Sequence, residues 1–413
     1  MANEVDSNRS RGVHVEDKDS KMGMTRRSLL AATPFAAAAA GLVSGRAMAA
    51  EVAAAATGEV SPPVGKAANS DKFPPLPSFK FSLENSNSEW KGKGGTAKEV
   101  NVSNFPISQS IAGVSMRLQP GGLRELHWHG SAAEWAYVIE GHVMTTIVSP
   151  DGTVEENEFG PGDIWYFPRG YGHALQGLGP GECHFLLGFD NGNFSEFGTF
   201  SITDWISKTP RHIAARNMGV PESVVASLPQ GELYIGQGKV PKFGEPFRNA
   251  NLEPSQLTHI YKLGAHSPKR FAGGEERVVS SLEFPIQTTL TSARLDLEPG
   301  SLREMHWHPN SDEWQYYTKG RARVGIFGAH GRVEMAEFGP GDVCFIPQGF
   351  GHWVEQLGGT PTQIVILFNN PLYTEISLSQ WLAANPAPLL ADNFGLTEQM
   401  IDKLPKAALG ILK

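Results

Sequence analysis

The sequence predicts an all-β protein in which two small antiparallel barrels, or jelly rolls, follow one another along the chain. Three observations support this fold class. The 413 residues include 46 Gly and 29 Pro, which favours many turns between short strands. Runs of β-branched and aromatic residues, such as W-A-Y-V-I-E-G at 135–141, alternate with those turns. The second half of the chain also repeats the first, and closing antiparallel strands into a barrel removes bare sheet edges.

The internal repeat keeps one spacing over a long stretch. R-E-L-H-W-H-G-S-A-A-E-W begins at 124 and R-E-M-H-W-H-P-N-S-D-E-W begins at 303, so the numbering offset between the copies is 179. Beyond Phe189 the offset falls to 176, so the first copy holds three more residues before Trp205. The stretch F-S-E-F-G-T (194–199) lies in that window. The chain is therefore a duplication whose first copy has gained, or whose second copy has lost, a piece of one loop.

The two copies and their flanks divide the chain into parts. We expect the first barrel domain over 73–232 and the second over 273–413, with 233–272 connecting them and beginning the second unit. Short helical segments are expected to close each barrel, as at 203–216, where Thr and Asp suit an N-cap. Residues 50–72 are rich in Ala, Pro, Gly and Ser, which is typical of a flexible leader.

Residues 1–49 are expected to be an export signal. M-T-R-R-S-L-L leads into an Ala-rich apolar run, and A-M-A (47–49) offers a small-residue cleavage site. The run contains Pro34 and is too short to span roughly 30 Å of hydrocarbon. Arg26 and Arg27 resemble the pair of a twin-arginine signal; the alternative is an ordinary secretory signal with an accidental pair. We therefore expect export, to the periplasm if the pair is functional.

The composition argues against several kinds of partner. The formal net charge is -8 and no block of Lys or Arg occurs, so neither nucleic acid nor a membrane surface is an expected partner. Two cysteines, Cys183 and Cys344, cannot build a disulfide framework. We expect both to be buried thiols on strands.

Each copy carries a set of residues suited to a metal ion. His127 and His129 lie two apart on a predicted strand, so both side chains face the barrel interior. Glu134 and His173 follow after turns. The second copy repeats the set as His306, His308, Glu313 and His352. A single His-x-His is usually an exposed or hydrogen-bonded pair, but two sets at one spacing favour Mn or Fe, since a hard carboxylate is present and thiolates are not.

The spacing of these residues resembles the two motifs of the cupin family. Residues 121–141 match Gly-x5-His-x-His-x4-Glu-x6-Gly, and residues 162–173 match Gly-x5-Pro-x-Gly-x2-His. Residues 300–320 and 341–352 match the same two patterns. The resemblance implies two tandem cupin domains, each a jelly-roll β-barrel followed by short helical segments.

Two cupins in one chain, with R-E-L-H-W-H and R-E-M-H-W-H, resemble the bicupin oxalate decarboxylases. That resemblance implies one Mn per cupin, oxalate as substrate, formate and carbon dioxide as products, dioxygen as a co-substrate, and a homo-oligomer, either trimer or hexamer. Arg124 and Arg303 would hold the substrate carboxylate. Simple strand alternation, however, places Arg124 on the face opposite His127 unless a bulge re-aims it.

The extra loop of the first copy resembles the lid of that family. Glu196 matches the lid glutamate, and Gly192 and Gly198 could act as hinges. Once oxalate has lost carbon dioxide, a proton delivered to carbon gives formate, whereas oxidation by dioxygen gives a second carbon dioxide and peroxide. An acid on a closing lid therefore predicts a decarboxylase with its main site in the first copy. Phe197 and Gly198 replace polar residues of the family lid.

Other residues near the two motifs have expected roles as well. Glu355, three residues after His352, resembles a glutamate of the family's second site, where it would support weak activity or satisfy a structural hydrogen bond. The second lid is shortened to N-P-L-Y-T (370–374). Trp128 and Trp307 are expected to point away from the metal and into the core.

Three alternative functions fit these residues less well. An Mn oxalate oxidase would need no acid over the substrate carbon, so Glu196 argues against it. A bicupin dioxygenase for an aromatic substrate, with Fe, Cu or Ni, should have a large apolar pocket, whereas Arg124 and Arg303 suit a small dianion. A storage or binding bicupin, which is not an enzyme, commonly loses metal ligands, and all eight are kept here.

Overall fold

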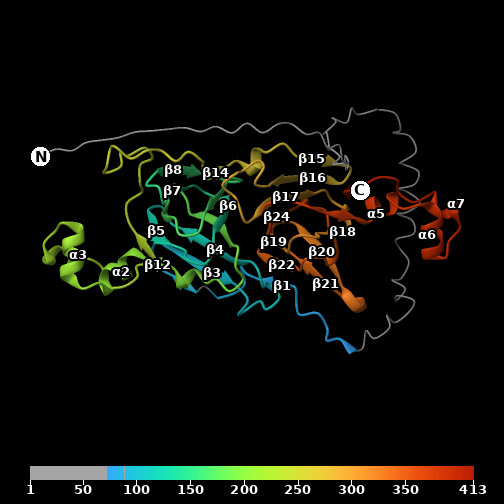
Figure 1. Ribbon diagram of the computed structural model, residues 1–413, viewed down its shortest axis with the longest axis horizontal. Coiled ribbons are helices and arrows are strands. Elements are labelled where there is room, and N and C mark those ends of the chain that lie inside the picture. The colour runs from blue at the N-terminus through green and yellow to red at the C-terminus, as the bar shows by residue number, and fades with distance from the viewer. Residues whose placement is uncertain (1–71, 88) are drawn as a thin grey trace, which may run out of the picture. The chain divides into compact units, whose positions relative to one another are not determined.

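The computed structural model describes residues 72–87 and 89–413, so the expected export signal and nearly all of the leader lie outside the described residues. Two β-barrels follow one another along the chain, each made of two antiparallel sheets (Figure 1). Helices are short and follow each barrel. The predicted all-β fold with two tandem barrels is confirmed.

The first barrel is built from a seven-stranded sheet in the order β14-β9-β6-β11-β4-β3-β2 and a sheet in the order β12-β5-β10-β7-β8, with β13 paired to β5. Its strands are β2 (Trp90–Lys91), β3 (Gly95–Val100), β4 (Ala112–Leu118), β5 (Gly122–Trp128), β6 (Glu134–Glu140), β7 (Val143–Val148), β8 (Val154–Phe159), β9 (Ile164–Phe167), β10 (Gly172–Gly177), β11 (Cys183–Phe189), β12 (Phe200–Ser201), β13 (Ile235–Gln237) and β14 (Ile260–Tyr261).

The second barrel repeats this plan with the orders β1-β22-β19-β24-β17-β16-β15 and β21-β20-β23-β18-β25, with β26 paired to β18. Its strands are β1 (Lys80–Ser82), β15 (Lys269–Phe271), β16 (Gly274–Val279), β17 (Thr291–Leu297), β18 (Leu302–Trp307), β19 (Glu313–Lys319), β20 (Arg321–Gly328), β21 (Arg332–Phe338), β22 (Asp342–Ile346), β23 (Gly351–Leu357), β24 (Thr362–Phe368), β25 (Ile376–Ser377) and β26 (Ile411–Leu412).

Glycines fix the same turns in both barrels. Gly141 has φ 73°, and Gly320, its counterpart in the second copy, has φ 71°. Gly162 and Gly341 have φ 90° and 89°. These left-handed conformations strain any residue that has a Cβ, so the turns require glycine where the two motifs repeat it.

Each barrel contains one strand from a chain segment outside the range expected for that barrel. β1 lies in the range that the sequence assigned to the first barrel, but Lys80 pairs with Cys344 of β22 in the second. β14 lies in the expected connection and pairs with β9 of the first barrel, with Ile260 opposite Trp165. Each exchange covers an edge strand, which would otherwise leave backbone hydrogen-bonding groups unpaired.

The seam between the barrels follows the duplication. Trp135 Nε1 donates to Ser292 Oγ at 2.7 Å. At the equivalent place, Trp314 packs so closely on Gly113 that a Cβ there would lie 2.6 Å from its ring. Ser292 is the counterpart of Gly113 in the second copy, and Trp314 is the counterpart of Trp135. The two halves therefore meet through the same strand positions.

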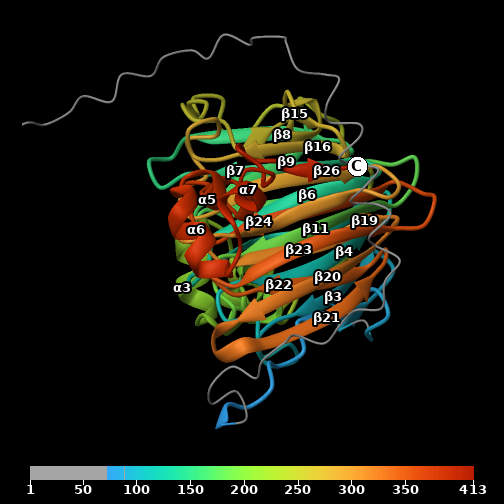
Figure 2. The ribbon, with the colours of Figure 1, turned by 90° about the vertical axis from the view of Figure 1, so that its right-hand side faces the viewer.

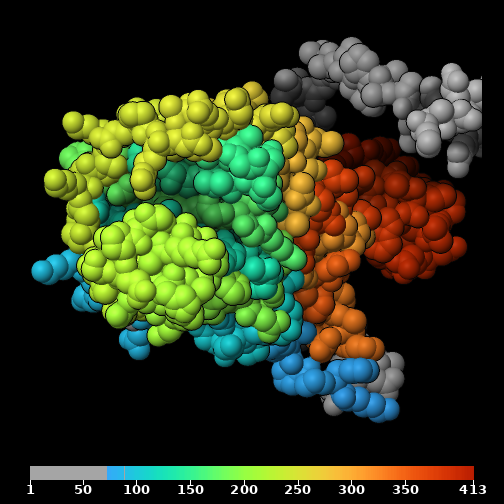
Figure 3. All heavy atoms as spheres, turned by 60° about the vertical axis from the view of Figure 1, so that its left-hand side comes forward, coloured from blue at the N-terminus to red at the C-terminus, as the bar shows by residue number. Residues whose placement is uncertain are grey.

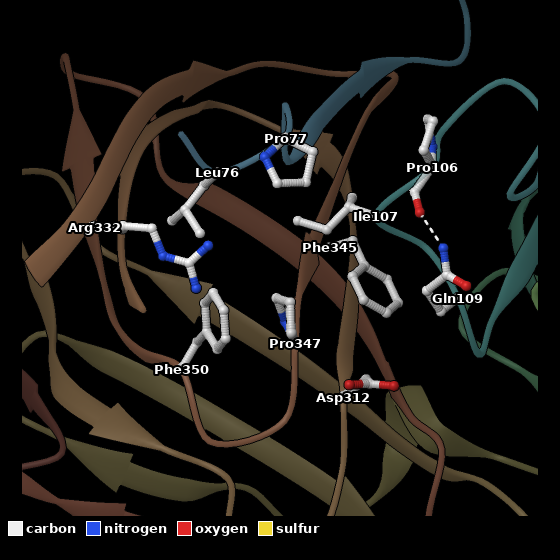
Figure 4. A pocket seen from close by; sticks show the side chains of 10 residues that line it. All are labelled: Leu76, Pro77, Pro106, Ile107, Gln109, Asp312, Arg332, Phe345, Pro347 and Phe350. Atoms are coloured by element: carbon white, nitrogen blue, oxygen red, sulfur yellow. Dashed lines mark hydrogen bonds between the residues drawn. The ribbon is translucent and has the colours of Figure 1, made fainter. Parts of the chain in front are cut away.

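A pocket of about 320 Å³ opens beside this seam. Leu76 and Pro77 of the N-terminal segment line it together with Ile107 of the first barrel and Phe345 and Phe350 of the second (Figure 4). None of the residues that line it is one of the eight expected metal ligands. It is a junction between chain segments rather than part of a metal site.

Short helices follow each barrel, and they form a lobe beside the first one (Figure 3) and a group beside the second (Figure 2). The sequence predicts two segments per barrel, but three helices form because Pro210 and Pro386 each separate one helix from the next. They are α2 (Ile202–Lys208), α3 (Arg211–Met218), α4 (Glu222–Ala226), α5 (Leu378–Ala383), α6 (Ala387–Phe394) and α7 (Glu398–Ile401). The N-cap of α2 is Ser201, two residues before the expected Thr203, and its Oγ accepts from Asp204 N at 3.1 Å. Among the described residues, no helix is both long enough and apolar enough to cross a bilayer.

We expect Gly113→Ala to destabilise the protein. Its Cβ would meet the rigid ring of Trp314, and overpacking of this kind costs about 1–3 kcal/mol of unfolding free energy. Thermal unfolding of the purified variant measures the effect. Gly181→Ala is the control, because nothing lies within 4 Å of a Cβ at that position. Equal melting temperatures for both variants would contradict close packing at the seam.

Candidate active site

Each barrel gathers the three histidines and the glutamate that the sequence predicts as metal ligands. All eight side chains are buried, and within each set the ligand atoms lie within 4.8 Å of one another. The first histidine of each pair lies on β5 or β18 and the second follows directly after that strand, β6 and β19 begin with the glutamate, and β10 and β23 carry the last histidine. The sets are His127, His129, Glu134 and His173, and His306, His308, Glu313 and His352.

Backbone carbonyls fix the orientation of these imidazoles. His127 Nδ1 donates to the carbonyl oxygen of Glu125 at 2.6 Å, and His173 Nδ1 donates to that of Tyr171 at 2.9 Å. The equivalent histidines of the second barrel do the same. With the proton on Nδ1, the Nε2 lone pair of each ring faces the centre of its set, as a metal ligand requires.

The residues fit a divalent metal ion. Among the described residues, His127 Nε2 and His173 Nε2 have no hydrogen-bond partner, and the same holds for His308 Nε2 and His352 Nε2. A buried polar atom without a partner is costly, and a metal ion would satisfy all of these lone pairs at once. Three imidazoles with one carboxylate and no thiolate suit Mn or Fe.

The charge state of the first set also suits metal binding. Burial, together with the nearby positive charge of Arg124, holds the pKa of His127 well below its ordinary value, so the ring is neutral. Burial by itself would raise the pKa of Glu134, but His173 and His129 hold it below its ordinary value. Neutral imidazoles and an ionised carboxylate are the forms that bind a metal.

A β-bulge brings Arg124 to the same side of β5 as His127. His127 pairs with His173 of β10, but Arg124 pairs with Leu175, so two residues of β5 face one residue of β10. Leu126 takes the outward position and is 54% exposed, whereas Arg124 is fully buried. The expectation from simple alternation fails here, and the position implied by the family resemblance holds.

Glu196 closes over the first ligand set. Its Oε1 lies 2.8 Å from both Nε and Nη2 of Arg124 and 3.9 Å from His127 Nε2. Its Oε2 lies 3.8 Å from His129 Nε2. Burial raises the pKa of Glu196 above its ordinary value, although Arg124 opposes the shift. The side chain is inaccessible to solvent, and among the described residues only Glu196 and Glu134 place a carboxylate oxygen within 4.0 Å of these histidines.

Hydrogen bonds to Glu99 hold the segment that carries Glu196. Glu99 Oε2 accepts from Glu196 N at 2.6 Å and from Ser195 Oγ at 3.1 Å. Of the two expected hinges, Gly198 has open space around it. Gly192 does not, because a Cβ there would lie 2.3 Å from the carbonyl oxygen of Ser108.

The second site contains two acidic residues that the sequence analysis did not single out. Arg303 Nη2 donates to Glu375 and lies 3.7 Å from Glu276 Oε1. The hydroxyl group of Tyr373 also donates to Glu375. Glu375 stands seven residues after Phe368, just as Glu196 stands seven after Phe189. This equal spacing could have identified Glu375 from the sequence, because it shows that the shorter loop of the second copy also contains a glutamate.

Comparisons with known proteins agree with this geometry. The family profile described as Cupin matches residues 81–226 and 263–402. The chain belongs to the cupin family. With one match on each copy, it is a bicupin.

The bicupin is also similar to proteins named as oxalate decarboxylases. It is 39% identical over 338 residues to oxalate decarboxylase OxdC of Bacillus subtilis, covering 81% of this chain and 86% of that one. It is 34% identical over 345 residues to a probable oxalate decarboxylase of Arthroderma benhamiae, covering 83% and 84%. A solved structure of the Bacillus subtilis enzyme, described by its Mn(II) centres, matches with a TM-score of 0.78 at 37% identity, covering 83% and 90%. The bicupin belongs with these enzymes.

Glu355 does not lie in the second site of the bicupin. β23 alternates, so His352 and Val354 face inward while Glu355 faces outward. Its carboxylate is 44% exposed and pairs with Arg323 Nη1 at 3.3 Å. Of the two roles expected for Glu355, weak activity at the second site does not fit this position, whereas a structural hydrogen bond does. Glu375 and Glu276 are the acidic residues beside Arg303 instead.

Trp128 and Trp307 point away from the ligands, but they do not enter the core. Trp128 is partly exposed and stacks on Phe200, with ring centroids 5.3 Å apart. Trp307 meets Trp381 edge-on at 5.4 Å. Both cover the outer face of a barrel where a helix follows. Cys183 and Cys344 are buried free thiols on β11 and β22, as expected.

We expect each ligand set of the bicupin to hold one metal ion independently. His173→Ala and His352→Ala should each leave one ion per chain, and the double variant none, because each removes an imidazole from one set only. Metal content by atomic spectroscopy measures this. His142→Ala, on the surface, is the control. Loss of both ions in either single variant would contradict independent sites.

Proposed function

We propose that this bicupin is a manganese-dependent oxalate decarboxylase, which converts oxalate and one proton to formate and carbon dioxide. The observation that carries the proposal is the Glu196–Arg124 pair directly over the first ligand set. The names of the similar proteins and their Mn(II) centres support the choice of substrate and metal.

The first ligand set would hold the manganese ion, which when bound would orient one carboxylate of oxalate and exchange an electron with it. Arg124 would hold a carboxylate oxygen of the substrate by the donors that Glu196 now occupies. Thr199 Oγ1 and the ring of Tyr234 keep the guanidinium in place, at 3.0 Å from Nη2 and 4.2 Å from Cζ. Substrate binding therefore requires Glu196 to leave Arg124, which requires the lid to open.

Glu196 would then supply the proton. When the lid closes over bound oxalate, its carboxyl group lies beside the carbon that loses carbon dioxide. Delivery of its proton to that carbon completes formate, and the carboxylate regains a proton from solvent when the lid opens. The closed lid also keeps dioxygen from oxidising the same carbon. Dioxygen is proposed as a co-substrate that is required but not consumed.

One alternative is an oxalate oxidase, which would follow if Phe197 and Gly198, in place of the polar residues of the family lid, changed how the lid closes. Phe197 packs on Tyr234 with ring centroids 4.9 Å apart, so the lid is held partly by an apolar contact. A lid that opened before protonation would release peroxide rather than formate.

An oligomer and an export route complete the proposal. On the outer face of the second barrel, Val333 and Met335 of the edge strand β21 are each 62% exposed, beside Phe327 and Trp381. They line an apolar groove of about 570 Å³, and we propose that further copies of the chain cover it in a trimer or hexamer. We also propose that residues 1–49 direct export to the periplasm. Light scattering and N-terminal sequencing of the protein isolated from that compartment test both.

Product analysis tests the reaction itself. Manganese-loaded protein given oxalate in air near pH 5 should form formate with little peroxide, because Glu196 stands over the reacting carbon. Formate, peroxide and metal content are measured together. Peroxide without formate would establish the oxidase, and neither product from protein with two ions bound would exclude oxalate as the substrate.

Glu196→Gln should abolish most formate production and leave bound manganese unchanged. The amide keeps the size of the side chain but has no proton to deliver, and loss of a positioned acid commonly lowers a rate by about 10²–10⁴-fold. Formate release and metal content are compared with those of Glu355→Gln, a surface control. Full decarboxylation by the Glu196 variant would remove that residue as the acid.

A further inference from the structure

The two arginines of the bicupin have different acidic neighbours. Arg124 pairs with Glu196 alone among the carboxylates within 4.0 Å in the described residues. Arg303 has two such neighbours: Glu375, to which it donates, and Glu276, 3.7 Å away. Within 4.0 Å, one arginine therefore has one acidic neighbour, and the other has two.

Glu276 has no acidic counterpart in the first barrel. The residue at the equivalent position of the first copy is Ala97, on strand β3 and fully buried. The acidic residue of β3 is Glu99, which holds the lid, and its counterpart on β16 is Val278. The buried glutamate of β16 therefore stands two residues earlier in the repeat than the glutamate of β3. Glu99 binds the segment that carries Glu196, whereas Glu276 lies beside Arg303.

The element that carries each carboxylate determines whether it can leave. Glu196 and Glu375 lie on loops after β11 and β24, so loop movement can withdraw both. Glu276 lies in the middle of β16, where it is paired with Lys269 of β15 and Leu295 of β17. A strand held on both sides does not move with a lid. Opening the second loop would leave Arg303 beside Glu276, whereas opening the first frees Arg124.

The space beside the second ligand set is small. Glu276, Arg303 and Tyr373 line a cavity of about 10 Å³ together with His306, His308 and Glu313. A cavity of this size holds about one water molecule. A dianion that reached it would also face the carboxylate of Glu276 where, in the first site, Ala97 offers no charge.

We propose that Glu276 excludes oxalate from the second metal site, so that each chain has two metal sites but only one site for the dianion. The inference rests on the proposed function, because oxalate is the ligand. Glu276 is a specificity-determining residue of the second site, and the second set of ligands holds its ion without admitting substrate.

The test counts bound oxalate by equilibrium dialysis of manganese-loaded protein without dioxygen, in a Glu196→Gln background that slows turnover. We expect one oxalate per chain in this background and two after Glu276→Ala, which introduces the residue of the first site. Glu276→Gln keeps the side-chain volume and tests the charge if the alanine variant loses metal. Glu275→Ala is the matched control, since Glu275 is the neighbouring residue of β16 and pairs with Arg270 and Arg277 instead.

Two results would overturn the inference: two oxalates per chain while Glu276 is intact, or no additional oxalate in either Glu276 variant with two manganese ions still bound. Failure of the proposed function gives a different result, because the Glu196→Gln protein then binds no oxalate at all. Even so, an oxalate gained only by the Glu276 variants would still support exclusion by that residue.

Discussion

In β5, two residues face the single residue Ala174 of β10, and this bulge turns Arg124 toward the same interior space as His127. The outward residue, Leu126, goes to the surface, and the other, Glu125, is buried and accepts from the backbone N–H groups of Leu233 and Tyr234. The bulge therefore brings a guanidinium to a metal-ligand set. It also lets Glu125 bind the backbone of the segment that follows α4. The same bulge in β18 does both for Arg303.

The two buried arginines differ in the elements that carry their acidic neighbours. A buried guanidinium must be paired, and in the first barrel its partner, Glu196, lies in the segment that follows β11 rather than on a strand. In the second barrel a strand carboxylate remains whatever the loop does. Duplication thus supplied two equal metal-ligand sets, and changes at single strand positions such as 97 and 276 made the sites chemically different.

Much of the fold could be predicted because it depends on local rules. Repeated glycines such as Gly141 and Gly320 require the same left-handed turns, and strand alternation directs the paired histidines inward. Contacts between distant segments could not be predicted in this way. The pairing of β1 with β22 joins the N-terminal part of the described chain to the second copy, and Glu355 was placed at the second site although alternation along β23 turns it outward. Trp128 was expected in the core because the sequence does not show which outer face a helix will cover.

The sequence by itself determined the duplication and the eight metal ligands, because both copies keep the same motif spacing and residues two apart on a strand share a face. It also contained Glu375, seven residues after Phe368, had the two loops been compared from that residue onward. Only the tertiary structure decided that Arg124 joins the ligands, that Glu196 covers them, and that Glu276 meets Arg303. Those relations depend on a bulge, a closed loop and the pairing of separate strands, which bring together residues that the chain itself keeps apart.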